Sequence, residues 1–323
     1  MKLSIIITQY NETERLLFPL LSSIDNQLGV NFNEIEILIL NDCSSTILSD
    51  SFLNSFVNIN PIYIQLKENI GVGLSRNEGM VYAKGEYIMF CDADDMFYMA
   101  GSLGLFFNEI DTKHPDICTS SWLEEQKIDE KYVYVQHKIE STWIHGKIYR
   151  KQYLIDNEIR FHSKFRVHED TYFNGLAFDL TNNKNYIDMV TYVWKYNPNS
   201  FTRVHNNSFS YKAFSVFIDA VIEFLKVIQT KRPDLMHYRV NQFILYVYFS
   251  FQLPHWQLED SYQYRIDCEN LFRPFIREYI YFYNTYPRSS FIELFNEERN
   301  KTLSNIFLEY ETFDSFLNKF ILP

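Results

Sequence analysis

The chain has 323 residues and a formal net charge of −11, with 46% hydrophobic and 22% charged residues. This composition is that of a globular protein with one large or two modest domains, and the negative charge argues against nucleic acid or an anionic membrane as the main partner. The four cysteines are widely spaced and form no CxxC pair, so neither a disulfide framework nor a zinc site is expected.

The first ninety residues alternate between strand and helix patterns. Strands are predicted at four short apolar runs: 3–7, 35–40, 61–66 and 87–91. Helical patterns lie between them, and we expect Asn11 to cap the first helix with Glu14 three residues later. Strands that alternate with helices predict a mostly parallel sheet, in which ligands bind beyond the carboxyl ends of the strands. Polar residues follow three of the runs, so we expect a ligand site there.

After the first ninety residues the expected secondary structure changes twice along the chain. From about 116 to 200 the pattern is mixed, with short strands expected at 131–135 and 186–194. From 208 onward the helical period dominates, with an apolar stripe that is typical of a core or an oligomer interface. The sequence therefore predicts an α/β domain over 1–207 and a helical C-terminal module over 208–323.

The N-terminal apolar stretch is too short for a signal peptide, and the run at 243–251 is about half the length that spans a bilayer. We therefore expect a cytoplasmic protein, either free or peripheral to the inner face of the membrane.

Three aspartates, Asp92, Asp94 and Asp95, follow the apolar run at 87–91. Carboxylates this close repel one another, and Mg²⁺ or Mn²⁺ would make them tolerable. A solvated acidic loop at a helix start is the alternative. A calcium loop would need further oxygen ligands at regular spacing, and a phosphatase nucleophile would need a hydroxyl at position 96, which is Met.

A glycine-containing stretch, N-I-G-V-G-L-S-R-N-E-G, covers residues 69–79. Gly71, Gly73 and Arg76 stand where a loop enters a helix, and backbone N–H groups with an arginine can hold a diphosphate there. An ordinary glycine turn with a surface arginine is the alternative. Asp42 can bind a base or ribose or cap a helix, and Tyr10 can stack on a base or belong to the core.

The order of these motifs resembles the family 2 glycosyltransferases, inverting enzymes of GT-A fold. The resemblance rests on seven stretches over about 200 residues: S-I-I-I-T-Q-Y-N-E, I-L-I-L-N-D-C-S-S, N-I-G-V-G-L-S-R-N-E-G, Y-I-M-F-C-D-A-D-D, H-G-K-I-Y-R, H-E-D-T-Y-F and N-P-N-S-F-T-R. It implies a Rossmann-like, mostly parallel sheet flanked by helices. The C-terminal 115 residues or so lie outside it.

The resemblance also implies roles for individual residues. Nucleotide-sugar contacts are implied for Thr8, Tyr10, Glu12, Asp42, Arg76 and Asp92, beside the diphosphate contact expected at Gly71 from its loop. The metal would be held by Asp94 and Asp92, with Asp170 as the catalytic base. The chain departs from the family pattern at Thr8, Cys43 and Thr46, which weakens the nucleotide assignment but not the metal or the base.

An inverting transfer needs a carboxylate that takes the acceptor proton on the face opposite the leaving diphosphate. We expect Asp170 to be that base and Glu169 to bind acceptor or order the site, although acids at a helix start also favour the helix dipole. Arg203 is a candidate for the diphosphate, and His205 for the diphosphate or the metal. His145 and Lys147 are candidates for the acceptor pocket, or Lys147 pairs with an acid.

The leading hypothesis is a metal-dependent transferase that moves a sugar from a nucleotide-diphosphate donor, UDP-linked, to a hydroxyl of a glycan or polymer. A sugar-phosphate nucleotidyltransferase fits less well, because the first strand lacks a glycine- and arginine-rich loop. A non-catalytic nucleotide-sugar-binding or assembly protein is the third hypothesis. The helical module would then pack on the first domain, form an oligomer or grip the acceptor.

Overall fold

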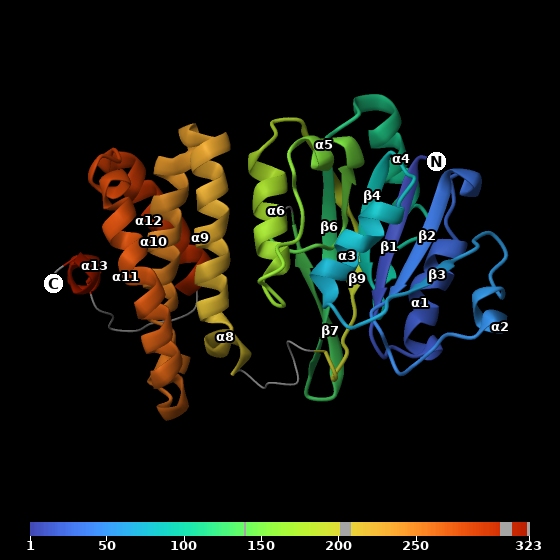
Figure 1. Cartoon of the computed structure of the whole chain (residues 1–323), viewed down its shortest axis with the longest axis horizontal. Coiled ribbons are helices and arrows are strands. Elements are labelled where there is room, and N and C mark those ends of the chain that lie inside the picture. The colour runs from blue at the N-terminus through green and yellow to red at the C-terminus, as the bar shows by residue number, and fades with distance from the viewer. Residues whose placement is uncertain (139, 201–207, 304–311, 322–323) are drawn as a thin grey trace. The chain divides into compact units, whose positions relative to one another are not determined.

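The computed structural model describes residues 1–138, 140–200, 208–303 and 312–321. The chain forms two compact units, Met1–Pro198 and Asn199–Pro323 (Figure 1). The change from mixed α/β to helical structure that the sequence predicts accompanies this division.

Within the described residues the first unit contains one nine-stranded sheet in the order β3-β2-β1-β4-β8-β6-β9-β5, with β7 paired to β6. Its strands are β1 (Leu3–Gln9), β2 (Ile35–Asn41), β3 (Ile62–Gln65), β4 (Tyr87–Asp92), β5 (Met96–Phe97), β6 (Ile117–Ile128), β7 (Lys131–His137), β8 (Lys147–Arg150) and β9 (Lys184–Trp194). The four strands predicted in the first ninety residues are β1 to β4, and all three pairs among them are parallel. The expected strands at 131–135 and 186–194 are confirmed as β7 and part of β9.

The register brings three strand ends to one edge of the sheet. Thr8 of β1 lies opposite Leu40 of β2 and Asp92 of β4, and Gln9 lies opposite Asn41. Because β1 and β2 are covered on both faces, they read as continuous apolar runs rather than as alternating ones. The polar residues that follow these strands therefore meet at one place.

Helices cover both faces of the sheet. The helices of this unit are α1 (Glu14–Asp25), α2 (Asp50–Leu53), α3 (Val72–Tyr82), α4 (Ser102–Lys113), α5 (Lys151–Asp156) and α6 (Glu169–Asp179), with the 3₁₀ turn η1 (Phe32–Glu34). Leucines of α1 and aromatic residues of α4 pack with Leu3, Ile5 and Ile7. On the opposite face, seen in Figure 1, α3 and α6 pack against the sheet, where Phe173 contacts Phe90.

The predicted cap of α1 is wrong. The helix begins at Glu14 after Thr13, whose side chain makes no capping hydrogen bond. Asn11 has a φ of 68° and its Oδ1 instead accepts the Ser45 N–H and hydroxyl. The side chain therefore joins the loops after β1 and β2.

The second unit is helical and aromatic throughout its described part. Its helices are α8 (Phe209–Lys212), α9 (Phe214–Lys231), α10 (Met236–Ser250), α11 (Tyr262–Asn284), α12 (Arg288–Leu303) and α13 (Phe313–Ile321), with 3₁₀ turns η2 (Pro233–Leu235), η3 (Pro254–Gln257) and η4 (Glu259–Ser261). The predicted stripe of α9 supplies buried Phe214, Ile218 and Leu225 to this core. None of the described helices is both long and apolar enough to cross a membrane.

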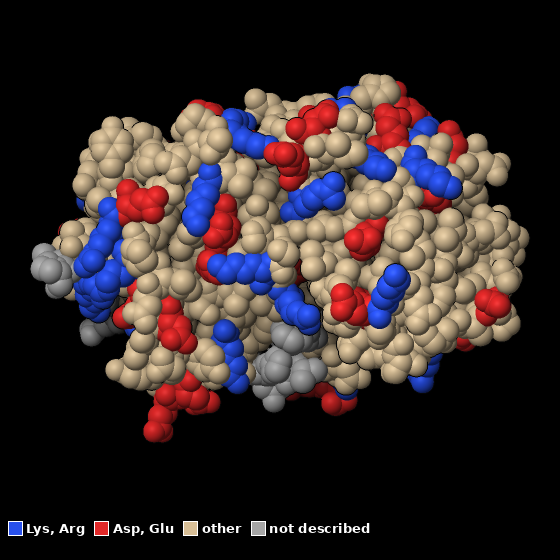
Figure 2. All heavy atoms as spheres, in the orientation of Figure 1, with Lys and Arg blue, Asp and Glu red and all other residues tan. Residues whose placement is uncertain are grey.

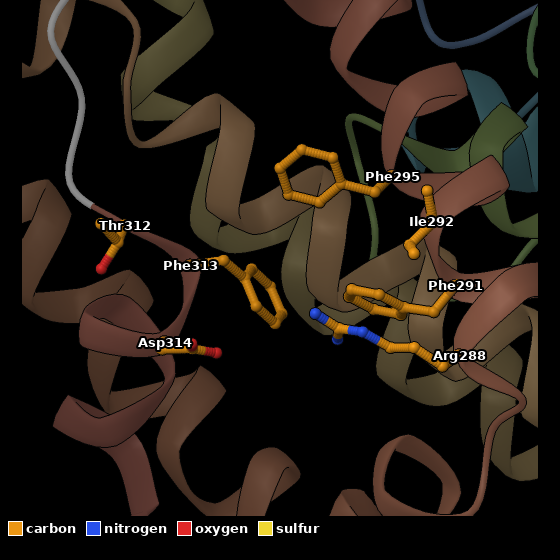
Figure 3. Close-up of a pocket in the computed structure, with 7 residues that line it drawn as sticks. All are labelled: Arg288, Phe291, Ile292, Phe295, Thr312, Phe313 and Asp314. Carbon is orange, nitrogen blue, oxygen red and sulfur yellow. The ribbon is translucent and has the colours of Figure 1, made fainter.

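A pocket of about 230 Å³ lies between α12 and α13 (Figure 3). Its lining consists of Arg288, Phe291, Ile292, Phe295, Thr312, Phe313 and Asp314. Figure 3 shows the Arg288 guanidinium beside the Phe291 ring, with Asp314 across the opening. None of the described residues that were predicted to bind a ligand lies in it.

Candidate active site

The turn after β4 places its carboxylates on two sides of the backbone. Asp92 and Asp94 are partly exposed, whereas Ala93 and Asp95 are buried. The Asn197 side-chain amide donates a 2.7 Å hydrogen bond to Asp94 Oδ2. Asp92 and Asp94 therefore reach the accessible edge of the sheet, and Asp95 turns inward.

Asp95 fastens this turn to the end of β9. Its carboxylate accepts hydrogen bonds from the Tyr192 hydroxyl and from the Lys195 N–H, both at 2.9 Å. The same Tyr192 oxygen accepts the Asp92 N–H at 3.2 Å. Burial, with the charges of Asp94 and Asp92, raises the pKa of Asp95 well above its ordinary value. Asp95 thus holds the turn in place from behind.

His145 lies on the inner side of the same turn. Its ring is 3% exposed and packs among Trp122, Tyr192 and Trp194. Burial lowers the pKa of His145 to about 4, so the ring is neutral near pH 7. Within the described residues its Nδ1 has no hydrogen-bond partner, and it lies 3.7 Å from Asp95 Oδ2. Asp92, Asp95 and His145 offer ligand atoms within 4.8 Å of one another.

Arg76 of α3 joins the β4 turn to the start of α6. Its Nη2 lies 2.7 Å from Asp92 Oδ1, and its Nη1 lies 3.0 Å from Glu169 Oε1. The guanidinium is buried, which alone would lower its pKa, but Asp92 and Glu169 outweigh this effect and raise it. A charge buried this deeply is tolerable only when it is paired, so these three residues form one electrostatic unit.

The first turn of α6 carries two acids in different environments. Glu169 is buried and held by Arg76, whereas Asp170 is partly exposed and accepts the Thr171 N–H at 2.8 Å. Burial, with the charge of Glu169, raises the pKa of Asp170 to about 8. His168, just before the helix, has a φ of 58°, an uncommon conformation for a residue other than glycine. Asp170 is thus the more accessible of the two, and its carboxylate is more basic than that of an ordinary aspartate.

Asp42, after β2, organises the loop that enters α3. Its two carboxylate oxygens accept the N–H groups of Ile70 and Gly71, each at 2.8 Å. Gly71 has a φ of 88°, in the region that favours glycine. Asp42 therefore fixes the loop on which the predicted diphosphate contacts depend.

The loop after β1 lies near the acidic turn. Tyr10 is 52% exposed, and its N–H donates a 2.5 Å hydrogen bond to Glu12 Oε2. Burial, with the charges of Asp94 and Asp92, raises the pKa of Glu12 to about 7, although backbone hydrogen bonds act to lower it. Glu12 therefore lies close enough for the charges of both aspartates to affect its pKa.

Residues 4–173, more than half of the chain, match the family model for Glycosyl transferase family 2. The chain belongs to this family. Its fold, with a mixed, mostly parallel sheet flanked by helices and then a helical region, agrees with the GT-A architecture that the sequence predicted.

Several relatives come from bacilli and staphylococci. The uncharacterized glycosyltransferase EpsJ of Bacillus subtilis is 24% identical over 62% of this chain and 63% of its own. The poly(ribitol-phosphate) beta-N-acetylglucosaminyltransferase TarS of Staphylococcus aureus is 28% identical over 55% of this chain and 32% of its own. A poly(ribitol-phosphate) beta-glucosyltransferase of Bacillus spizizenii is 30% identical over 55% and 30%. The family 2 chain described here thus spans less than two thirds of the length of these relatives.

Solved structures agree on the fold. S. aureus TarS 1–349 in complex with UDP-GlcNAc superposes with a TM-score of 0.66 at 19% identity, covering 96% of this chain and 94% of that one. The mannosyltransferase PcManGT of Pyrobaculum calidifontis, in complex with GDP-Man and Mn²⁺, gives 0.52 at 11% identity over 70% and 64%. The likeness to TarS extends over the helical unit, which the sequence resemblance did not reach.

The β4 turn of this family 2 glycosyltransferase suits a divalent cation. Carboxylate oxygens are the ligands that Mg²⁺ and Mn²⁺ accept. Asp92 and Asp94 are the more accessible pair because both are partly exposed, whereas Asp95 is buried and each of its oxygens accepts a hydrogen bond. Asp92 and Asp94 therefore suit the predicted metal site, and Asp95 and His145 lie on its buried side.

Other predicted residues lie in less open places. Lys147 is fully buried, and its ammonium donates to Glu140 Oε1 at 2.5 Å and to the Trp143 carbonyl at 2.6 Å. Pairing with an acid, the alternative considered for Lys147, is what the structure shows. His145 is likewise buried, so any acceptor role for either residue remains a prediction. Arg203 and His205 lie outside the described residues.

Three residues that support the site escaped sequence reasoning. Tyr192 bridges Asp92 and Asp95, Asn197 binds Asp94, and Gln9 donates to the carbonyls of Glu12 and Thr46. Tyr192 lies within the strand predicted at 186–194, and Asn197 begins the N-P-N-S-F-T-R motif. No pattern in the sequence signals that these side chains turn toward the β4 aspartates.

Proposed function

We propose that this protein is a metal-dependent inverting glycosyltransferase that moves a sugar from a UDP-linked donor to a hydroxyl of a surface polymer. The observation that carries the proposal is the Arg76 bridge. It brings the β4 turn, suited to a cation and a diphosphate, next to the first turn of α6, which bears an accessible basic carboxylate. A transferase needs these two groups in one site.

At the donor end, Asp92 and Asp94 would hold Mn²⁺ or Mg²⁺. Such a cation neutralises the charge that develops on a leaving diphosphate. The backbone of the loop that Asp42 holds stands at the N-terminus of α3, where N–H groups favour an anion. Tyr10, exposed at the same edge, offers a ring for the base, and Thr8 and Glu12 would line the pocket.

At the acceptor end, Asp170 would act as the general base. The acceptor hydroxyl gives its proton to the Asp170 carboxylate while its oxygen attacks the anomeric carbon, and the sugar–diphosphate bond breaks on the opposite side. A carboxyl whose pKa lies near 8 is a better proton acceptor than an ordinary aspartate. Glu169 is held by Arg76 and would instead keep α6 in register with the β4 turn.

Donor and acceptor are proposed from the relatives. UDP-GlcNAc is the ligand named for the TarS 1–349 structure, and poly(ribitol-phosphate) is the acceptor named for two of the relatives. We therefore propose a UDP-sugar, with UDP-GlcNAc tested first, and a polyol-phosphate polymer as acceptor. A cytoplasmic location, an oligomer formed through the C-terminal helices and a domain boundary at 207/208 stay predictions.

The proposal is tested by thermal shift and then by transfer. UDP with Mn²⁺ should raise the melting temperature, EDTA should abolish the shift, and one UDP-sugar should shift it further. Asp94→Ala should remove the metal-dependent part, and Asp170→Asn should keep donor binding while losing transfer. A chain that binds no nucleotide under any of these conditions would refute the proposal, and donor binding without transfer to any polymer would favour a binding protein.

A further inference from the structure

The last nine residues of the loop between α5 and α6, which follow the exposed Glu158, are unusual in their charge. Residues 160–168 read R-F-H-S-K-F-R-V-H, with two arginines, a lysine and two histidines but no acid, in a chain whose net charge is −11. Elsewhere on this unit acidic and basic side chains are mixed, as Figure 2 shows for one face. Arg160, Lys164 and Arg166 are all exposed. Within the described residues neither arginine forms an ion pair, so both charges are available to a ligand.

The loop is anchored by its apolar residues. Asn77 of α3 donates its side-chain amide to the Phe161 carbonyl at 2.8 Å and accepts the Phe161 N–H at 2.9 Å. The Phe161 ring stacks on Phe173 of α6 with centroids 4.1 Å apart, and Phe165 is buried as well. The aromatic residues hold the backbone to α3 and α6, while Lys164 between them and Arg160 and Arg166 on either side are exposed.

The cations lead toward the proposed base. Arg160 directly precedes Phe161, the residue that contacts Asn77 in the middle of α3. Arg166 lies at the start of α3, where a Cβ on Gly71 would be 3.8 Å from its Cγ. Gly71 and Asn77 are six residues apart along the helix, which corresponds to about 9 Å at the usual rise of an α-helix. Glu169 and Asp170 follow three and four residues after Arg166, so the loop forms a line of positive charge that ends beside the active site.

We propose that Arg160, Lys164 and Arg166 form a docking track for the phosphate groups of an anionic polymer acceptor. The inference rests on the proposed function and adds to it the surface that receives the acceptor. A polyanion is repelled by a protein of net negative charge unless a local cationic surface receives it, and a neutral glycan would gain little from three cations. Only Arg166 also lies near the predicted diphosphate contacts.

The test measures binding of purified poly(ribitol phosphate) to the full chain, with neutral dextran as a comparison. Arg160→Glu should weaken binding about threefold to tenfold, and adding Lys164→Glu should weaken it further. Arg166 is left unchanged because it lies beside Gly71. Arg160→Lys should retain binding, and binding by the wild-type chain should fall between about 50 and 200 mM salt.

Lys84→Glu is the matched control. This exposed lysine precedes β4, at the edge of the sheet opposite to the acidic turn, so the same change of charge should leave polymer binding unaltered. The proposal is overturned if the wild-type chain does not bind the polymer, if dextran binds equally well, or if Arg160→Glu and Lys84→Glu behave alike. The thermal shift that UDP and Mn²⁺ produce in each protein reports on the donor site separately. If this shift is absent from the wild-type chain as well, the proposed function fails, whereas a normal shift with no polymer binding overturns only the docking proposal.

Discussion

At the scale of single residues, replacing Asp170 should lower activity but raise stability. Asp170 is the proposed general base, and it is also a carboxyl whose pKa the fold raises. Asp170→Asn should lower kcat by about 10²- to 10⁴-fold, because the general base is lost. It should also stabilise the fold. The pKa of Asp170 is about 8 in the folded chain and near 4 when unfolded. The unfolded state therefore releases its proton first, and wild-type stability falls as pH rises from 4 to 8.

The gain for Asp170→Asn should be near zero at pH 4 and reach about 1–2 kcal/mol at pH 8. This figure is discounted because the side chain is partly exposed and its titration is shared with Glu169. Urea unfolding of both proteins at several pH values measures it. In the wild type, kcat/KM should rise with pH up to about 8. A variant that is inactive but equally stable at every pH would contradict the raised pKa.

Arg76 should contribute to the free energy of unfolding mainly through its ion pairs with Asp92 and Glu169. Arg76→Met leaves Asp92 and Glu169 without their partner, and removing one member of a buried pair costs about 3–5 kcal/mol. In a double-mutant cycle with Glu169→Gln, the cost of Arg76→Met should shrink by at least about 1 kcal/mol. Denaturant unfolding of the four proteins gives the coupling. Additive costs would mean that the two side chains do not interact in solution.

At the scale of elements, the site depends on how closely α3 approaches α6. A Cβ on Gly73 would lie 3.0 Å from Glu169 Cγ and 3.2 Å from Phe161 Cβ. Gly73→Ala should therefore push the first turn of α6 away and cost about 1–3 kcal/mol, with a fall in kcat because Asp170 moves with it. Gly101→Ala is the control, since nothing lies within 4 Å of that position, and it should change stability by less than about 0.5 kcal/mol. Unfolding curves and initial rates would show whether only Gly73→Ala affects both.

The elements themselves could largely be predicted, whereas several contacts between them could not. Strands β1 to β4 are buried runs ending in polar residues, and a parallel sheet aligns those ends, so Asp42 and Asp92 were expected at one edge. The Arg76–Glu169 pair joins residues 93 positions apart, and Tyr192 reaches Asp95 from β9. Such contacts depend on how the mixed half of the sheet, β5 to β9, folds back. No period or spacing in the sequence encodes that arrangement.

The same limit explains His145 and Lys147. Their motif suggested a pocket for the acceptor, but the loop before β8 folds over both side chains. Lys147 is fully buried beside Glu140, and His145 packs against tryptophans. Sequence reasoning identified residues that belong to the neighbourhood of the site. It could not distinguish those that face a ligand from those that support the turn, because that depends on burial.

At the scale of the whole molecule, the division into Met1–Pro198 and Asn199–Pro323 makes a prediction about how ligands act. The residues that would bind donor and metal, apart from Arg203 and His205, all belong to the first unit. We therefore expect calorimetry of the full chain to show two unfolding transitions. UDP with Mn²⁺ should shift only one of them, by about 5–10 °C at a hundredfold excess over Kd.

The fragments 1–198 and 1–207 then separate the roles of the two remaining residues. The shorter fragment keeps Asp92, Asp94 and Asp170 but lacks Arg203 and His205. If those two bind the diphosphate and the cation, UDP with Mn²⁺ should stabilise 1–207 more than 1–198, and Arg203→Ala with His205→Ala in 1–207 should remove the difference. Equal shifts in both fragments would place the whole donor site before residue 199. A single transition in the full chain would instead mean that the helical unit unfolds together with the sheet.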